Sequence, residues 1–436
     1  MQTRFSTEAL ADPHIRELEG ILRSCVHCGL CTATCPTYVT LGDERDSPRG
    51  RIYLIKDLLE SGRKMTVEDV TPIDHCLSCL SCMTTCPSGV DYRRLVDAAR
   101  LRIGKTYRRA PFDAALRAVL VRLLSSPRAF RSALRLAAVG RSFRPVIRRL
   151  PGIGPQLDAM LALAPKPPPR AAAISKTSFA VSPGRRAGAR RRMALLTGCA
   201  ESVLAPEINA AAVRLLNRAG IEVVAPKGEG CCGSLAHHMG AEERALRQAR
   251  ADIDAWSREI EGEGLEAIVV TASGCGATIK DYGYMLRDDP AYAATARAVA
   301  SLARDVSEVA GDLDLPYAAP RRLAVAYHAA CSLQHGQRIV DAPKALLRRA
   351  GFDVRSIPEQ HLCCGSAGTY NILQPAIAGA LRDRKVANIA RVKPDVIAAG
   401  NIGCIAQIAS ASPTPVVHTI ELLDWASGGE KPAAIV

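Results

Sequence analysis

This 436-residue sequence lacks several features, and each absence narrows the class of protein. No apolar run approaches the roughly 20 residues that a membrane-spanning helix needs, which argues against an integral membrane protein. The first twenty residues contain no apolar stretch typical of a secretion signal, so we expect a cytoplasmic protein. Aromatic residues make up only 4% of the chain, and no G-x-G-x-x-G dinucleotide fingerprint is present. We therefore expect no nucleic acid partner, because aromatic stacking surfaces are scarce, and no FAD on this chain.

Acidic residues are nearly absent from one segment. Residues 101–192 contain 21 Lys and Arg but only two acidic residues, Asp113 and Asp158, so this segment carries +19 in a chain of net charge +14. Within it, residues 112–150 mix leucine and valine with arginine in the pattern of basic amphipathic helices. This pattern fits a surface that contacts anionic lipid or an acidic partner subunit, and equally fits helices packed on the other domains with solvated arginines. A proline-rich stretch at 165–169 and the basic stretch 184–192 predict a linker.

Cysteine, by contrast, is abundant, with sixteen residues in two patterns. The first pattern, C-x2-C-x2-C-x3-C-P, occurs at 25–36 and again at 76–87. It is the ligand spacing of a two-cluster bacterial ferredoxin, in which the fourth cysteine of each run binds the other cluster. A zinc ribbon would use two C-x2-C pairs, and a disulfide framework suits small secreted domains, so neither explains the pattern. The spacing predicts two [4Fe–4S] clusters, the first bound by Cys25, Cys28, Cys31 and Cys86 and the second by Cys76, Cys79, Cys82 and Cys35.

The interval between Cys35 and Cys76 is long for a minimal ferredoxin. Residues 48–60 within it have the apolar spacing of a helix, and we expect further helices at 14–24 and 92–103. These patterns predict an α-helical ferredoxin domain over 1–105, followed by a basic helical region with a proline-rich linker over 106–192.

The second cysteine pattern, C…CCG…C, also occurs twice, and the sequence around it repeats. Apolar segments at 193–197, 221–224 and 267–273 correspond to segments at 323–327, 352–355 and 395–401, and a helical segment at 211–220 corresponds to 343–351. The repeat predicts two tandem α/β domains with parallel sheets, over 193–320 and 321–436, in an α+β multidomain protein. Because ligands of such sheets gather at the carboxyl ends of strands, we expect the cysteines that follow strands to converge there. The first set is Cys199, Cys231, Cys232 and Cys275, and the second is Cys331, Cys363, Cys364 and Cys404.

The spacing of these eight CCG cysteines is compatible with three roles and does not distinguish among them. A zinc site, a redox disulfide and an unusual iron–sulfur cluster are all open, although adjacent cysteines chelate a single tetrahedral ion poorly. The repetition of all four positions argues against a fourth alternative, buried cysteine acting as a small hydrophobic residue. Nearby histidines are candidates for proton transfer at an organic acceptor or for hydrogen bonds to sulfur. They are His328, His335 and His361 beside the second set, and His237 and His238 beside the first.

Two ferredoxin runs followed by two CCG repeats resemble the iron–sulfur subunits that accompany membrane-linked flavin dehydrogenases. That group includes subunits of glycerol-3-phosphate dehydrogenase, lactate-utilisation proteins and heterodisulfide reductase. The longer phrases are most similar to the glycolate oxidase (glycolate dehydrogenase) iron–sulfur subunits. These phrases lie at 22–38, 47–60, 85–92, 271–283, 361–370 and 401–404.

The resemblance implies an electron-transfer subunit rather than the subunit that oxidises the substrate. FAD-containing partner subunits would oxidise glycolate to glyoxylate, and this chain would pass the electrons to quinone or another membrane acceptor at the inner face of the inner membrane. Lactate or glycerol-3-phosphate as the substrate, and a heterodisulfide-reductase-like thiol/disulfide activity, are the alternatives. Heterodisulfide reductase repeats end in C-x2-C, and neither Cys275 nor Cys404 is followed by that second cysteine. This departure argues against a five-thiolate cluster here.

Overall fold

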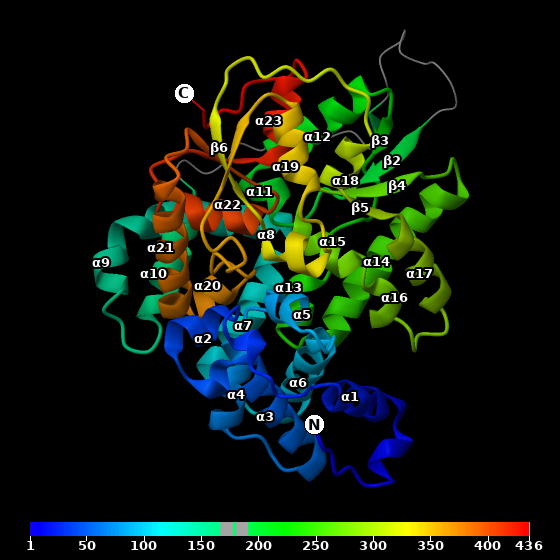
Figure 1. Cartoon of the computed structure of the whole chain (residues 1–436), viewed down its shortest axis with the longest axis vertical. Helices are drawn as coiled ribbons and strands as arrows, with labels where there is room; N and C mark the ends of the chain where they lie inside the picture. The colour runs from blue at the N-terminus through cyan, green and yellow to red at the C-terminus, as the bar shows by residue number, and fades with distance from the viewer. Residues whose placement is uncertain (166–177, 180–190, 436) are drawn as a thin grey trace.

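The computed structural model describes residues 1–165, 178–179 and 191–435, and Figure 1 shows their arrangement. Most of the predicted linker, residues 166–177 and 180–190, lies outside the described residues. The N-terminal part, the basic helices and the two sheets are ordered in that sequence along the chain, and the sheets lie at the end of the molecule opposite to the N-terminus (Figure 1).

Residues 1–106 are helical and contain no strand. The predicted helices at 14–24, 48–60 and 92–103 are confirmed as α1, α3 and α6. Ser47 begins α3, because its side chain accepts a hydrogen bond from Gly50 N. Pro48 fits the first turn, where a backbone N–H would have no partner within the helix. Buried Leu22, Ile55 and Leu95 form part of the core of this domain. Its α-helices are α1 (Pro13–Arg23), α2 (Pro36–Leu41), α3 (Pro48–Ser61), α4 (Val67–Asp74), α5 (Ser81–Thr85) and α6 (Tyr92–Thr106), with 3₁₀ turns η1 (Ala9–Ala11), η2 (Leu30–Thr32) and η3 (Glu44–Asp46).

The basic region folds into helices, as predicted. Leu120, Val121, Phe130 and Leu134 are buried, and α8 packs against α11 while α10 packs against α20 and α21. One face of these basic helices is therefore packed against the rest of the protein, which was one of the two alternatives that the sequence left open. The other face keeps exposed apolar residues, described below. The elements are α7 (Pro111–Leu124), α8 (Pro127–Gly140), η4 (Arg141–Phe143), α9 (Arg144–Ile147) and α10 (Gly154–Leu163).

The two CCG repeats form two sheets with the same parallel order. The first sheet is β1-β3-β2-β4-β5, in which only β1 is antiparallel, and the second is β7-β6-β8-β9. The predicted strands are confirmed, but the short strands β5 and β9, each of three residues, were missed. The strands are β1 (Ser178–Phe179), β2 (Arg192–Leu195), β3 (Glu222–Val224), β4 (Ala267–Val270), β5 (Ala303–Asp305), β6 (Ala324–His328), β7 (Asp353–Ser356), β8 (Val396–Ala399) and β9 (Val416–His418).

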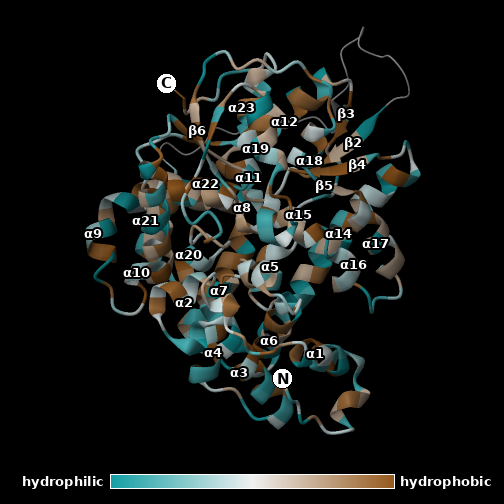
Figure 2. Cartoon of the chain, in the orientation of Figure 1, coloured by the Kyte–Doolittle hydropathy of each residue, from teal (hydrophilic) through white to brown (hydrophobic). Residues whose placement is uncertain are grey.

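The repeats share one hydrophobic core. Leu195, Val325 and Val396 belong to the same buried cluster, and α12 packs on α23, where Arg214 pairs with the fully buried Asp424 at 2.6 Å. Figure 2 shows hydrophobic residues along β4, whose residues are all buried. The helices are α11 (Glu201–Leu204), α12 (Pro206–Arg218), α13 (Ser234–His238), α14 (Glu242–Glu261), α15 (Ser273–Ile279), α16 (Tyr282–Met285), α17 (Ala293–Leu302), α18 (Val306–Gly311), α19 (Ala342–Arg349), α20 (Tyr370–Leu373), α21 (Pro375–Arg391), α22 (Ile402–Ala409) and α23 (Thr419–Ala426), with the π-helical turn η5 (Ser332–Gly336).

Candidate metal and electron-transfer sites

The two ferredoxin-type runs fold into the same turn. In each run the two residues that flank the second cysteine have positive φ: His27 (57°) and Gly29 (82°) in the first, Ser78 (51°) and Leu80 (61°) in the second. Non-glycine residues rarely adopt this left-handed conformation unless the surroundings require it. Its presence at the same two positions of both runs indicates that the turn is built to direct its three cysteines.

The four cysteines assigned to the first cluster border one small cavity. Cys25, Cys28, Cys31 and Cys86 line a space of about 30 Å³, together with Cys82 of the second run. Cys28 is exposed, whereas the other three are buried or half-buried. The crossed arrangement therefore brings the fourth cysteine of the second run beside the first run.

Two of the cysteines assigned to the second ferredoxin-type cluster, Cys35 and Cys76, receive hydrogen bonds from buried groups. The guanidinium of Arg51, only 1% exposed, donates to Cys35 Sγ at 3.8 Å and pairs with Asp46 at 3.1 Å. Tyr92 Oη donates to Cys76 Sγ at 3.7 Å, and Thr37 Oγ1 lies 3.2 Å from Cys35 Sγ. Hydrogen bonds to sulfur are among the factors that set the potential of an iron–sulfur cluster.

The CCG cysteines of each copy converge at the carboxyl ends of the strands, as predicted. Cys199 Sγ lies 3.4 Å from Cys231 Sγ in the first copy, and Cys331 Sγ lies 3.9 Å from Cys363 Sγ in the second. The Cys199 thiol, which donates to Cys231, lowers the pKa of Cys231 to about 3. Hydrogen bonds from the neighbouring thiols likewise lower the pKa of Cys363, although burial opposes this effect, so each set favours a thiolate, the form that binds metals.

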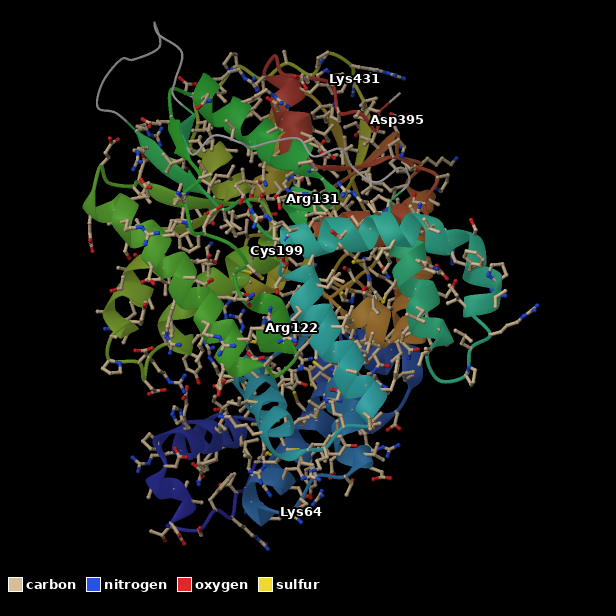
Figure 3. All side chains as sticks on the ribbon, turned by 180° about the vertical axis from the view of Figure 1, so that it is seen from behind. Lys64, Arg122, Arg131, Cys199, Asp395 and Lys431 are labelled. Atoms are coloured by element: carbon tan, nitrogen blue, oxygen red, sulfur yellow. The ribbon has the colours of Figure 1, made fainter. Side chains whose placement is uncertain are left out.

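All eight CCG cysteines line a single cavity of about 590 Å³. Residues 76–78 of the second ferredoxin run also reach this cavity. An apolar part of its remaining wall comes from the basic helices, a contribution that the sequence analysis missed. These wall residues include Leu120, Leu123 and Leu124 of α7, Phe130, Leu134 and Ala137 of α8, and Leu157, Met160 and Leu161 of α10. Figure 3 shows Cys199 close to the point where α7 ends and α8 begins, the helices that carry Arg122 and Arg131.

Glu201 and His238 are among the titratable side chains in the wall of this CCG cavity. Glu201 accepts a hydrogen bond from Thr271 Oγ1, and burial raises the pKa of its carboxyl to about 8. Burial lowers the pKa of His238, which also lines the cavity, to about 3. His237, another candidate, instead pairs with Asp97 at 3.1 Å.

The other histidine candidates lie outside the cavity wall. His335 Nδ1 hydrogen-bonds Thr84 Oγ1 at 2.7 Å, and its Nε2 lies 3.2 Å from the His361 carbonyl oxygen. His328 is also absent from the cavity wall, and it is buried beside Cys364 and Cys404.

The geometry agrees with comparisons to known proteins. A model of the 4Fe-4S dicluster domain matches residues 21–90, and a model of the cysteine-rich CCG domain matches residues 193–280 and 325–409. The glycolate oxidase iron-sulfur subunit of Escherichia coli is 42% identical over 98% of this chain and 99% of its own length. The chain belongs to the family of glycolate oxidase iron–sulfur subunits.

Two further curated proteins are similar to this chain at lower identity. The probable glycolate oxidase iron-sulfur subunit of Bacillus subtilis is 30% identical over 94% of this chain and 95% of its own length. Lactate utilization protein A of Bacillus licheniformis is 27% identical over 53% of this chain and 99% of its own length. Like other glycolate oxidase iron–sulfur subunits, this chain is an electron-transfer component of an oxidoreductase and holds iron–sulfur clusters. No helix among its described residues is both long and apolar enough to cross a membrane.

Proposed function

We propose that this chain receives electrons from FAD-containing subunits that oxidise glycolate to glyoxylate, and delivers them to quinone or another lipophilic acceptor at a membrane. The E. coli relative, a glycolate oxidase subunit by name, aligns over almost the whole of both chains, which supports glycolate as the source of electrons. Because one relative is a lactate utilization protein, lactate is the alternative source.

The residues present fit two [4Fe–4S] clusters. All sixteen cysteines are free thiols, and we assign Cys25, Cys28, Cys31 and Cys86 to one cluster and Cys76, Cys79, Cys82 and Cys35 to the other. When bound, such clusters accept and release single electrons, which lets them couple a two-electron flavin to a distant acceptor. The eight CCG cysteines are candidate ligands of an additional centre. The domain boundaries given above, at about 105, 192 and 320, are part of the same proposal.

The observation that carries the proposal is the CCG cavity. Cys79 of the second ferredoxin run packs in one buried cluster with Cys363, with Cys331 against it, so this run adjoins the second CCG copy. From there the cavity extends along the apolar faces of α7, α8 and α10. Ligand sites are commonly apolar cavities with a few polar groups, and a cavity that joins thiols to an apolar wall fits a lipophilic redox partner. Glu201, with its raised pKa, is placed to supply a proton as such an acceptor is reduced.

A second feature, on the surface of the basic helices, supports the delivery of electrons to an acceptor at a membrane. Leu136, Val139, Phe143 and Val146 follow one another at intervals of three or four residues along α8, η4 and α9, and they are 59–74% exposed. We call these four residues the exposed stripe. Arg135, Arg148 and Arg149 are exposed beside it. An exposed apolar row flanked by arginines is the pattern of a helix that lies on anionic lipid, and α8 also walls the cavity.

The source of electrons is tested on the complex co-purified without oxygen. We expect glycolate to produce the electron paramagnetic resonance (EPR) signal of a reduced [4Fe–4S] cluster, with flavin content measured on the same sample. A signal that appears with lactate or dithionite but not with glycolate, in a sample that retains its flavin, would refute glycolate as the donor.

The acceptor site is tested by filling the cavity. Ala137 lines it, whereas its neighbour Ala138 is exposed and lies outside the lining, so the two positions form a matched pair. We expect Ala137→Trp to lower the rate of glycolate-dependent reduction of a short-chain quinone at least about tenfold, while reduction of a small water-soluble dye is retained. Ala138→Trp should leave both rates unchanged. Equal quinone rates in the two variants would refute the cavity as the acceptor site.

A further inference from the structure

His328 lies at the centre of the second CCG set. It is the last residue of β6, and its ring, Cys364 Sγ and Cys404 Sγ can all offer ligand atoms within 4.8 Å of one another. The set continues through Cys363, the neighbour of Cys364, to Cys331, whose Sγ lies 3.9 Å from Cys363 Sγ. Five metal-binding side chains from three separate segments, 328–331, 363–364 and 404, therefore meet at one place.

The ring of His328 is buried beside Cys364 and Cys404 but makes no hydrogen bond within ordinary distances. The residue is 2% exposed, and neither Nδ1 nor Nε2 has a hydrogen-bond partner among the described residues. Burying a polar group without a partner is costly, so such a group requires an explanation. His418, fully buried at the end of β9 in the same sheet, shows the usual solution. Its Nε2 bonds the Thr271 carbonyl oxygen at 3.0 Å, and its Nδ1 accepts from Ile420 N at 3.1 Å.

The first CCG copy lacks this histidine. The copies are offset by 132 residues at Cys199 and Cys331, which places Leu196 where the second copy has His328. Leu196 is 2% exposed, like His328, so the same buried position is filled by an apolar side chain in one copy and by an imidazole in the other. The histidine is therefore not needed to build the repeat.

We propose that His328 is an imidazole ligand of an iron–sulfur centre held in the second CCG copy by Cys331, Cys363, Cys364 and Cys404, and that the first copy has no such ligand. This proposal rests on the proposed iron–sulfur role of the CCG cysteines. Five donors exceed the four of a tetrahedral zinc site, and neighbouring thiolates can reach different irons of a cluster. Imidazole is an accepted ligand of protein iron–sulfur clusters, as the two histidines of Rieske centres show.

The test uses the full-length protein, produced with ¹⁵N-labelled histidine and purified without oxygen. Pulsed EPR measures magnetic coupling between the centre and histidine nitrogen, and chemical analysis gives iron, zinc and sulfide per chain. We expect the coupling in the wild type and in His361→Leu, which alters a histidine outside the set. His328→Leu, which copies the first repeat, should abolish it and lower the iron content by the same amount as Cys364→Ser. In His328→Cys, a replacement thiolate should retain the iron without the nitrogen coupling.

The possible results separate the two proposals. If Cys364→Ser loses iron but His328→Leu keeps both its iron and the nitrogen coupling, His328 is not a ligand, although a CCG centre exists. Unchanged iron in Cys364→Ser, or zinc in place of iron, overturns the centre itself. Neither result alters the response of the ferredoxin-type clusters to glycolate, which tests the proposed function separately.

Discussion

Removal of the Arg51 guanidinium should lower the potential of the cluster bound by Cys35 and Cys76. Arg51 is buried 3.8 Å from Cys35 Sγ, and it also donates to the Pro72 carbonyl oxygen at 2.6 Å. A positive charge stabilises the reduced cluster, which carries one more negative charge than the oxidised cluster. Arg51→Met removes that charge and nearly preserves the volume of the side chain.

The size of the effect follows from the distance. At 3.8 Å and an effective dielectric constant of about 20, unit charges interact by about 4 kcal/mol. Because the added electron is shared over the whole cluster, we take about half of this value, ~2 kcal/mol, which corresponds to a potential lower by about 90 mV for a one-electron couple. The variant also leaves Asp46 buried with His75 at 2.9 Å, and breaking a buried ion pair costs about 3–5 kcal/mol of stability.

An EPR-monitored redox titration of the anaerobic protein measures this shift. Arg45→Met is the matched control, because Arg45 is an exposed arginine in the preceding turn η3 whose charge is screened by solvent. Adding Asp46→Asn to Arg51→Met removes a negative charge as well, so the potential should recover by more than half and stability should improve. A shift below about 20 mV in Arg51→Met with the cluster intact would refute the electrostatic argument.

Three further predictions concern other parts of the chain. Cys28→Ser should cost one cluster and most of the electron flux, measured by iron content and glycolate-dependent dye reduction, and normal values would contradict the ligand assignment. Burial raises the pKa of Glu229 to about 8, so the native state retains a proton that the unfolded chain loses above its ordinary pKa, and stability should fall as pH rises from about 4.5 to 8. Between pH 6 and 8, Glu229→Gln should remove roughly 2 kcal/mol of the decrease in the free energy of unfolding, measured by anaerobic urea unfolding. An unchanged pH profile in this variant would contradict the raised pKa of Glu229. Replacing Leu136 and Phe143 of the exposed stripe by Ser should release the protein from anionic vesicles in a flotation assay. The control Val67→Ser, at an exposed position on α4, should leave vesicle binding unchanged. Equal vesicle binding of all variants would exclude the stripe as the membrane contact.

Local sequence patterns were sufficient to predict most of the fold. The interval between cysteines within a run depends only on a tight turn, so the two ferredoxin runs could be recognised without any long-range contact. The CCG repeat was visible because each copy encodes the same strand order, and parallel strands of this kind are continuous apolar runs. The strands β5 and β9 were missed because three residues carry too little periodicity to stand out.

The identity of the partners of each side chain was decided only by the tertiary structure. The composition of 112–150 fitted packed helices and a lipid-facing surface equally well, and the structure contains both, since Leu134 is buried against α11 while Leu136 is 74% exposed. His328 and His418 likewise each end a strand of the same sheet, yet backbone groups hydrogen-bond the ring of His418, whereas the ring of His328 lies beside Cys364 and Cys404 without a hydrogen bond. Spacing along the chain determines which cysteines share a turn, but contacts between distant segments determine what surrounds them. The sequence by itself therefore identified the eight ferredoxin-type cysteines and the CCG repeat, and the fold brought the basic helices over the CCG cysteines to form one cavity.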